Sequence, residues 1–88
     1  QEEITVDVVV KDDAVVIKGV AGEVGSHFDP LWILRLSRAF EQTRIFLSDE
    51  KLLKTEAWLV RRGLAVESLS KALKEVAAAT RILLEELG

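Results

Sequence analysis

Side chains able to do chemistry are few in this chain, and one short segment brings three of them together. Ser26, His27 and Asp29 place a hydroxyl, an imidazole and a carboxylate within four residues. A nucleophilic triad needs such groups to converge in space beside an oxyanion site. Asp29 instead precedes Pro30 in the pattern of a helix N-cap, and neighbours in an extended loop usually point apart. We therefore expect no catalytic residue and no enzyme activity.

Metal and cofactor sites are not indicated either. The chain contains one His and no Cys, which excludes thiolate-ligated zinc, and a lone His cannot complete a zinc site. The spacing of Gly19, Gly22 and Gly25 is not that of a phosphate-binding loop, and no Lys follows them in the required place. We expect no cofactor, no metal and no small-molecule substrate.

Composition and charge narrow the class of protein. The formal net charge of −3, from 15 acidic and 12 basic residues, gives no bulk attraction to nucleic acid or to an anionic membrane. No apolar run approaches the roughly 20 residues needed to cross a bilayer, and no signal-peptide pattern opens the chain. The 88 residues fit a single domain with a modest core. We predict one soluble domain, residues 1–88, of unknown compartment.

The N-terminal segment, residues 3–20, predicts a β-hairpin. Apolar residues alternate along it with the period of a strand that has one buried face, and Asp12-Asp13 is the expected two-residue turn. The expected partners are Val10 with Val15, Val8 with Ile17, Val6 with Gly19, and Asp7 with Lys18. On the far face Val9 then lies opposite Val16. This apolar patch is either partly exposed or the contact surface of a homodimer.

Three helices are expected after a connector at residues 21–28, at about 29–47, 49–62 and 66–87. Asp29 and Pro30 start the first, Ser48 caps the second, and Gly63 ends it. The expected buried stripe of the second helix is Leu52, Leu53, Ala57, Leu59 and Val60. The predicted fold is therefore α+β, an N-terminal β-hairpin packed on three α-helices in the order ββααα.

Trp58 is the first candidate for an interaction surface. On a helical wheel it falls opposite the apolar stripe and among four basic residues, which are Lys51, Lys54, Arg61 and Arg62. An aromatic ring surrounded by cations can anchor a partner or stack on a base. The alternative is that Trp58 packs on the hairpin or on the first helix, with basic stems lying over it. Together with Val9 and Val16, these residues form the predicted interaction surface.

Residues 63–73, Gly-Leu-Ala-Val-Glu-Ser-Leu-Ser-Lys-Ala-Leu, resemble the turn and recognition helix of helix-turn-helix DNA-binding proteins. That resemblance implies a small nucleic-acid-binding domain that uses the second and third helices. Ser68, Lys71 and Lys74 would then make the nucleic-acid contacts. Glu67 and Glu75 cancel the positive charge on the same face, where phosphate contacts are needed. Nucleic-acid binding is therefore the alternative hypothesis.

In overall style the chain resembles de novo designed small α+β domains. It has no Cys, Met, Tyr or Asn, its only Pro begins a helix, and its last predicted helix is rich in Leu. Natural thermophile proteins also avoid these labile residues, so a thermostable protein of either origin fits. The resemblance implies a stably folded structural or interaction scaffold without catalytic activity, and that is the leading hypothesis from the sequence.

Overall fold

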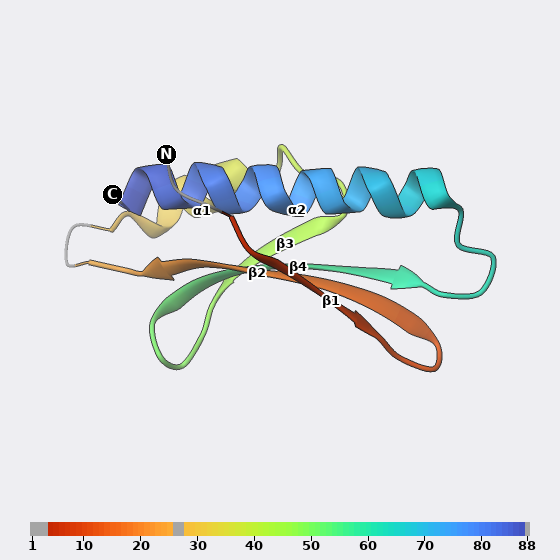
Figure 1. Ribbon diagram of the computed structural model, residues 1–88. Helices are drawn as coiled ribbons and strands as arrows, with labels where there is room; N and C mark the ends of the chain where they lie inside the picture. Colours follow the sequence, from red (N-terminus) through yellow and green to blue (C-terminus); the bar gives the residue numbers. More distant parts are fainter. Residues whose placement is uncertain (1–3, 26–27, 88) are drawn as a thin grey trace.

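The structure is a computed structural model that describes residues 4–25 and 28–87. Its elements follow in the order β1 (Val6–Val10), β2 (Ala14–Glu23), α1 (Pro30–Ser37), β3 (Thr43–Leu47), β4 (Leu52–Val60) and α2 (Val66–Leu87). Within the described ranges the strands form one antiparallel sheet in the order β1-β2-β4-β3. Helix α2 lies along one face of this twisted sheet (Figure 1). The architecture is α+β with the order ββαββα.

The predicted N-terminal hairpin is confirmed. Strands β1 and β2 pair in the predicted register, with Val8 opposite Ile17, Asp7 opposite Lys18 and Val9 opposite Val16. The turn at Asp12-Asp13 is closed by the backbone N–H of Lys11, which donates to the carbonyl of Ala14 at 2.8 Å. The period-2 pattern was enough to predict this register, because only one register places the aliphatic side chains of both strands on the same face.

The prediction of three helices packed on a hairpin is wrong. The helix expected at 29–47 ends at Ser37, and Thr43–Leu47 form strand β3. The helix expected at 49–62 does not form, because Leu52–Val60 are strand β4. Along β4 the buried residues are Leu53, Thr55 and Ala57, a spacing of two that a strand requires and a helix does not.

Other local predictions are confirmed. Asp29 caps α1 by accepting a hydrogen bond from the backbone N–H of Leu31 at 3.0 Å, and Pro30 opens the helix. The helix expected at 66–87 is α2. Gly63 has the positive φ expected of it, 75°, but it follows strand β4 rather than a helix.

The core lies between α2 and the two central strands, β2 and β4, in two clusters. The first contains four buried residues, Ile17, Ala57, Ala72 and Val76. The second contains Ala21, Leu53 and Leu83, onto which residues of α1 also pack. Between the clusters the side chains of Thr55 and Thr80 meet over Gly19. Small residues at this crossing let the helix approach the sheet closely.

Candidate protein-interaction surface

The face of the sheet turned away from α2, here called the outer face, carries a row of alternating charges. Asp7 of β1 pairs with Lys18 of β2, Lys18 with Glu56 of β4, and Glu56 with Arg44 of β3. The row therefore reads minus, plus, minus, plus across all four strands. Nη2 of Arg44 lies 4.0 Å from Oε1 of Glu56. We call these four residues the charged row.

Trp58 lies next to the charged row, on the same face. It pairs with Val16, which in turn pairs with Val9. Val16 is fully buried, whereas Trp58 is 51% exposed. The amine of Lys11 lies 4.5 Å from the centre of the indole ring, and the indole N–H donates to the carboxylate of Glu56. Trp58 thus covers Val16 and still presents half of its surface to solvent.

The cationic ring predicted around Trp58 is not assembled in the predicted way. Spacings of three and four residues bring side chains together on a helix, but β4 is a strand. Lys54 shares the outer face with Trp58, four residues away along the strand, while Lys51 lies in the turn before β4. Beyond β4, Arg61 donates from its guanidinium to the carbonyl of Lys11 at 3.1 Å, and Arg62 is exposed. The cation over the indole comes instead from Lys11.

Strand β1 has an edge that no other described strand pairs with. Antiparallel pairing alternates residues whose backbone groups face the neighbouring strand with residues whose groups face away. Because the N–H of Lys11 donates to Ala14, the backbone groups of Val6, Val8 and Val10 face outward. The side chains of Val8 and Val10 are 46% and 61% exposed. Backbone donors, backbone acceptors and apolar side chains therefore lie together at this edge.

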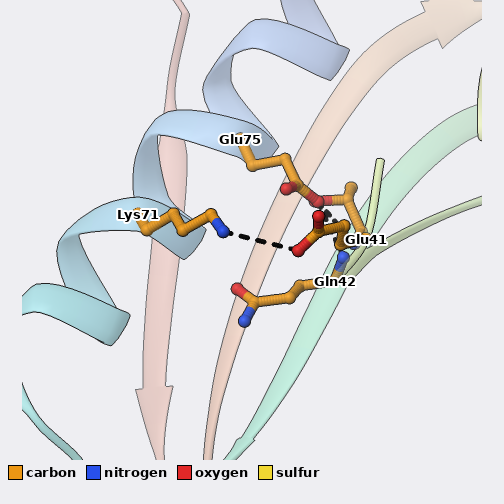
Figure 2. Close-up of polar contacts among 5 residues, drawn as sticks. Glu41, Gln42, Lys71 and Glu75 are labelled. Atoms are coloured by element: carbon orange, nitrogen blue, oxygen red, sulfur yellow. Dashed lines mark hydrogen bonds and ion pairs between the residues drawn. The ribbon is translucent and has the colours of Figure 1, made fainter. Parts of the chain in front are cut away.

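Figure 2 shows the polar contacts that join α2 to the start of β3. Oε1 of Glu75 accepts hydrogen bonds from the backbone N–H groups of Gln42 and Thr43, both at 2.9 Å. Burial raises the pKa of Glu75, but these hydrogen bonds outweigh it, and the pKa is lowered overall. Nζ of Lys71 pairs with Glu41 at 3.4 Å. These contacts hold α2 against the start of the edge strand β3.

The helix-turn-helix hypothesis is wrong, because its first helix does not exist. Residues before Gly63 form strand β4, so residues 63–73 join a strand to a helix. Ser68, Lys71 and Lys74 are exposed on α2, but Lys71 is engaged with Glu41. The apolar spacing that resembled a recognition helix instead serves to pack α2 on the sheet.

Ser26, His27 and Asp29, the residues first considered for chemistry, are not seen to form a site together. Ser26 and His27 lie outside the described residues. Asp29 caps α1 and also lines a hollow of about 270 Å³ with Phe28, Trp32, Gly25, Glu86 and Leu87. In residues 4–25 and 28–87 no three His, Asp or Glu side chains gather in a way that could hold a metal ion.

No helix in these ranges is both long and apolar enough to span a bilayer.

Two of the four residues of the charged row were not predicted from the sequence. The pair Asp7 and Lys18 was predicted from the hairpin register, but Arg44 and Glu56 were assigned to helices. Alternation of charge with apolar residues in Thr-Arg-Ile-Phe-Leu and Lys-Thr-Glu-Ala-Trp was the signal that could have found them.

Comparison with solved structures finds the same fold in a natural protein. No protein-family model and no curated protein sequence matches the chain. The structure is similar to that of SpcU in the heterodimeric complex ExoU–SpcU from the type III secretion system of Pseudomonas aeruginosa. The TM-score is 0.81 at 15% sequence identity, and the match covers 98% of this chain and 76% of the other.

This similarity overturns the interpretation of the chain as a designed three-helix scaffold. The ββαββα arrangement is shared with a component of a natural secretion system over nearly the whole chain. The absence of Cys and Met and the residues typical of helix starts indicated a style of composition, and many stable natural domains have that style too.

Proposed function

We propose that this chain is a protein-binding domain without catalytic activity, which holds an extended segment of a partner in the manner of a secretion chaperone. The observation that carries the proposal is the apolar edge of β1, which pairs with no other strand within residues 4–25 and 28–87. The similarity to SpcU supports it, because SpcU forms a heterodimeric complex with ExoU within a type III secretion system. A fold used for binding another protein suits a chain with few reactive side chains.

The proposed mode of binding is addition of a strand beside β1. The outward N–H and C=O groups of Val6, Val8 and Val10 would form a ladder with the backbone of the partner. Main-chain hydrogen bonds of this kind supply affinity, and alternate side chains supply specificity. Val8 and Val10 lie on the side of the sheet that α2 covers, yet they stay exposed. Apolar side chains of the partner would pack beside them.

The second edge strand, β3, is less suited to this role. Its first residue, Thr43, is held by Glu75 of α2, and α1 packs against it. Natural proteins usually protect edge strands with Lys, Pro or covering elements. Strand β1, with the sequence Val-Asp-Val-Val-Val, contains neither Lys nor Pro, and this favours β1 as the binding edge.

Hydrogen exchange offers a direct test with peptides selected from a random phage-displayed library. In the free protein the amides of Val8 and Val10 should exchange fast, because their N–H groups face outward. The amide of Val9 should exchange slowly, because it faces β2. On saturation with a selected peptide, Val8 and Val10 should become protected by at least about tenfold, while Val9 changes little.

A proline substitution separates edge pairing from simple apolar contact. Val8→Pro removes one outward donor without removing a hydrogen bond of the β1–β2 ladder, and Pro is tolerated at such edge positions. It should abolish peptide binding, whereas the control Val8→Thr should retain it. Selected peptides that bind Val8→Pro as well as they bind the wild type would exclude the β1 edge, and a library that yields no binder would contradict the proposal.

A second role is favoured by a separate observation, the half-exposed Trp58 on the outer face. Val9, Val16 and Trp58 form an apolar strip there. We also propose that this strip takes part in self-association, as the hairpin pattern predicted. This role does not depend on the β1 edge, because the two surfaces face different directions.

A further inference from the structure

Asp7 lies at the negative end of the charged row, on the edge strand β1, and is exposed. Among the described strands only β2 pairs with β1, where Lys18 lies opposite Asp7. Within residues 4–25 and 28–87 the row contains one ion pair, which joins Arg44 to Glu56 at the other end. The carboxylate of Asp7 is therefore the first charge that a strand added to β1 would meet.

An antiparallel strand added to β1 places one side chain directly beside Asp7. Every strand pair of the described sheet is antiparallel, and such an added strand continues the pattern. Because the outward backbone groups belong to Val6, Val8 and Val10, the residue opposite Asp7 falls in a non-hydrogen-bonded pair. In these pairs the Cα atoms are about 4.5 Å apart, against about 5.5 Å in hydrogen-bonded pairs, and the side chains lie closer. The partner side chain thus comes nearest at the only charged residue of β1.

Strand β2 shows which sequence suits the side chains of β1. Residues 16–18, Val-Ile-Lys, lie opposite Val9, Val8 and Asp7 in turn. A cation is thus paired with the carboxylate, and an aliphatic residue with each valine. Opposite charges across a strand pair are stabilising, and like charges are destabilising. Since side chains stand above and below the sheet, the same three are available to a strand on the other edge, and the same pattern fits there.

The side of β1 that faces α2 favours apolar residues in the partner. Val6 of β1 and Leu69 and Leu73 of α2 pack against the first core cluster but are only half-buried. Val8, next on the same face of β1, is 46% exposed, and Val9 on the outer face is 38% exposed. Apolar partner residues opposite these three valines would bury surface that is exposed in the free protein.

We propose that the segment bound at β1 runs antiparallel to it and carries a Lys or Arg opposite Asp7, with apolar residues opposite Val6, Val8 and Val9. From its N-terminus the segment has two apolar residues, the cation and one further apolar residue. Repulsion by Asp7 rejects segments with an acidic residue at the third position. The inference rests on the proposed function, because it specifies the class of segment that the β1 edge binds.

Two synthetic peptides that differ in one residue test the charge. They are acetyl-Thr-Val-Ile-Lys-Val-Thr-amide and the same peptide with Glu in place of Lys. N-methyl groups on the first Val and on the Lys or Glu block the edge that faces away from β1, so the peptides cannot stack into sheets. Fluorescence anisotropy of labelled peptides gives their dissociation constants with the 88-residue chain.

The wild type should bind the Lys peptide at least about threefold more tightly than the Glu peptide at low salt. This preference should shrink in about 1 M salt, where the Debye length is about 3 Å. An isomer of the Lys peptide with its N-methyl groups on Ile and on the last Val tests the register. Those amides face β1 in the proposed arrangement, so the isomer should not bind.

Variants of Asp7 assign the preference to this residue. Asp7→Lys should prefer the Glu peptide by a similar factor. Asp7→Asn should bind the two peptides about equally, and it avoids the repulsion that a cation at position 7 meets from Lys18. Asp49→Lys changes the net charge by the same amount, in the exposed turn between β3 and β4, and should keep the wild-type preference. Far-UV circular dichroism must show each variant to be folded.

The outcomes separate this inference from the proposed function. Equal binding of the Lys and Glu peptides by the wild type, with binding still lost in Val8→Pro, would overturn the role of Asp7 and leave edge pairing intact. An unchanged preference for the Lys peptide in Asp7→Lys would also overturn that role, and binding of the N-methyl isomer would overturn the register. If the Lys peptide bound Val8→Pro as well as it binds the wild type, the proposed function itself would be wrong.

Failure of the Lys peptide to bind the wild type at millimolar concentration would overturn the proposed pattern. Library-selected peptides of another pattern that bind the wild type but not Val8→Pro would then preserve edge pairing without it.

Discussion

The hydroxyl groups of Thr55 in β4 and Thr80 in α2 lie 2.8 Å apart in the buried core. Thr80 also donates to the carbonyl of Val76 at 2.7 Å. A hydroxyl has a single proton, so Thr80 must accept from Thr55, and the donor and acceptor roles are fixed. The pair joins the helix to the sheet between the two apolar clusters, directly over Gly19.

Gly19→Ala should destabilise the protein. A Cβ at this position would lie 2.5 Å from the hydroxyl oxygens of both Thr55 and Thr80. Relief requires either the loss of their hydrogen bond or a shift of α2, and overpacking of this kind costs about 1–3 kcal/mol. Urea unfolding measures the change. Gly25→Ala is the control, because nothing lies within 4 Å of its added Cβ. Equal stability of the two variants would show that α2 can move without cost.

Removing the two hydroxyls should have unequal effects. Thr80→Val leaves the buried hydroxyl of Thr55 without its acceptor, which costs about 1–3 kcal/mol. Thr55→Val leaves Thr80 bonded to Val76, so it should cost less. The double variant should be little worse than Thr55→Val alone, because no orphan hydroxyl remains. Free energies of unfolding for the three variants form a double-mutant cycle, and additive losses would disprove the assigned donor direction.

The sequence allowed prediction of the hairpin and of α2, because in both segments the hydrophobic period agreed with the turn or cap residues at their ends. The prediction was wrong at β3 and β4, where the hydrophobic pattern fits both a helix and a strand. Leu52, Leu53 and Val60 suit one side of a helix, whereas Leu53, Thr55 and Ala57 suit one face of a strand. Only pairing with β2, a contact distant in sequence, decides between them. Two residues of the charged row, Arg44 and Glu56, were missed for the same reason, because they join the row only when β3 and β4 form strands.

The turn between β3 and β4 explains the false helix start at Ser48. There the N–H of Lys51 donates to the carbonyl of Ser48, and the N–H of Ser48 donates to the carbonyl of Leu52, both at 2.9 Å. Ser48 also accepts from the N–H of Leu52 through its hydroxyl. A Ser followed by acidic residues is favoured in this three-residue loop as well as at a helix N-cap.

Lys51→Gly should stabilise the protein. Lys51 has a φ of 63°, a left-handed conformation that costs a residue with a Cβ about 1–2 kcal/mol. Glycine removes this cost but loses more entropy on folding, so we expect a net gain of about 0.5–1 kcal/mol. Thermal unfolding measures it. Glu50→Gly, in the same turn but without a positive φ, is the control and should give no gain. A lower melting temperature for Lys51→Gly would contradict the assigned turn.

Stability should fall at acid pH in a way that depends on Glu75. Backbone hydrogen bonds from Gln42 and Thr43 lower its pKa in the folded protein below the ordinary value of 4.5. A carboxylate whose folded pKa is depressed adds stability above its unfolded pKa, and this contribution is lost as pH falls through the folded pKa. The contribution is therefore complete at neutral pH and should decline below pH 4.5.

Glu75→Gln isolates this contribution. At pH 7 the variant keeps an acceptor but loses its charge, so it should be about 1 kcal/mol less stable than the wild type. Because the loss arises from the charged form, the difference in unfolding free energy should shrink as the pH is lowered from 4.5 toward 3. Glu85→Gln, on the exposed side of the same helix, should change stability by less than about 0.5 kcal/mol. If the difference in unfolding free energy between Glu75→Gln and the wild type stayed constant across this range, the charge of Glu75 would not be the source of its contribution to stability.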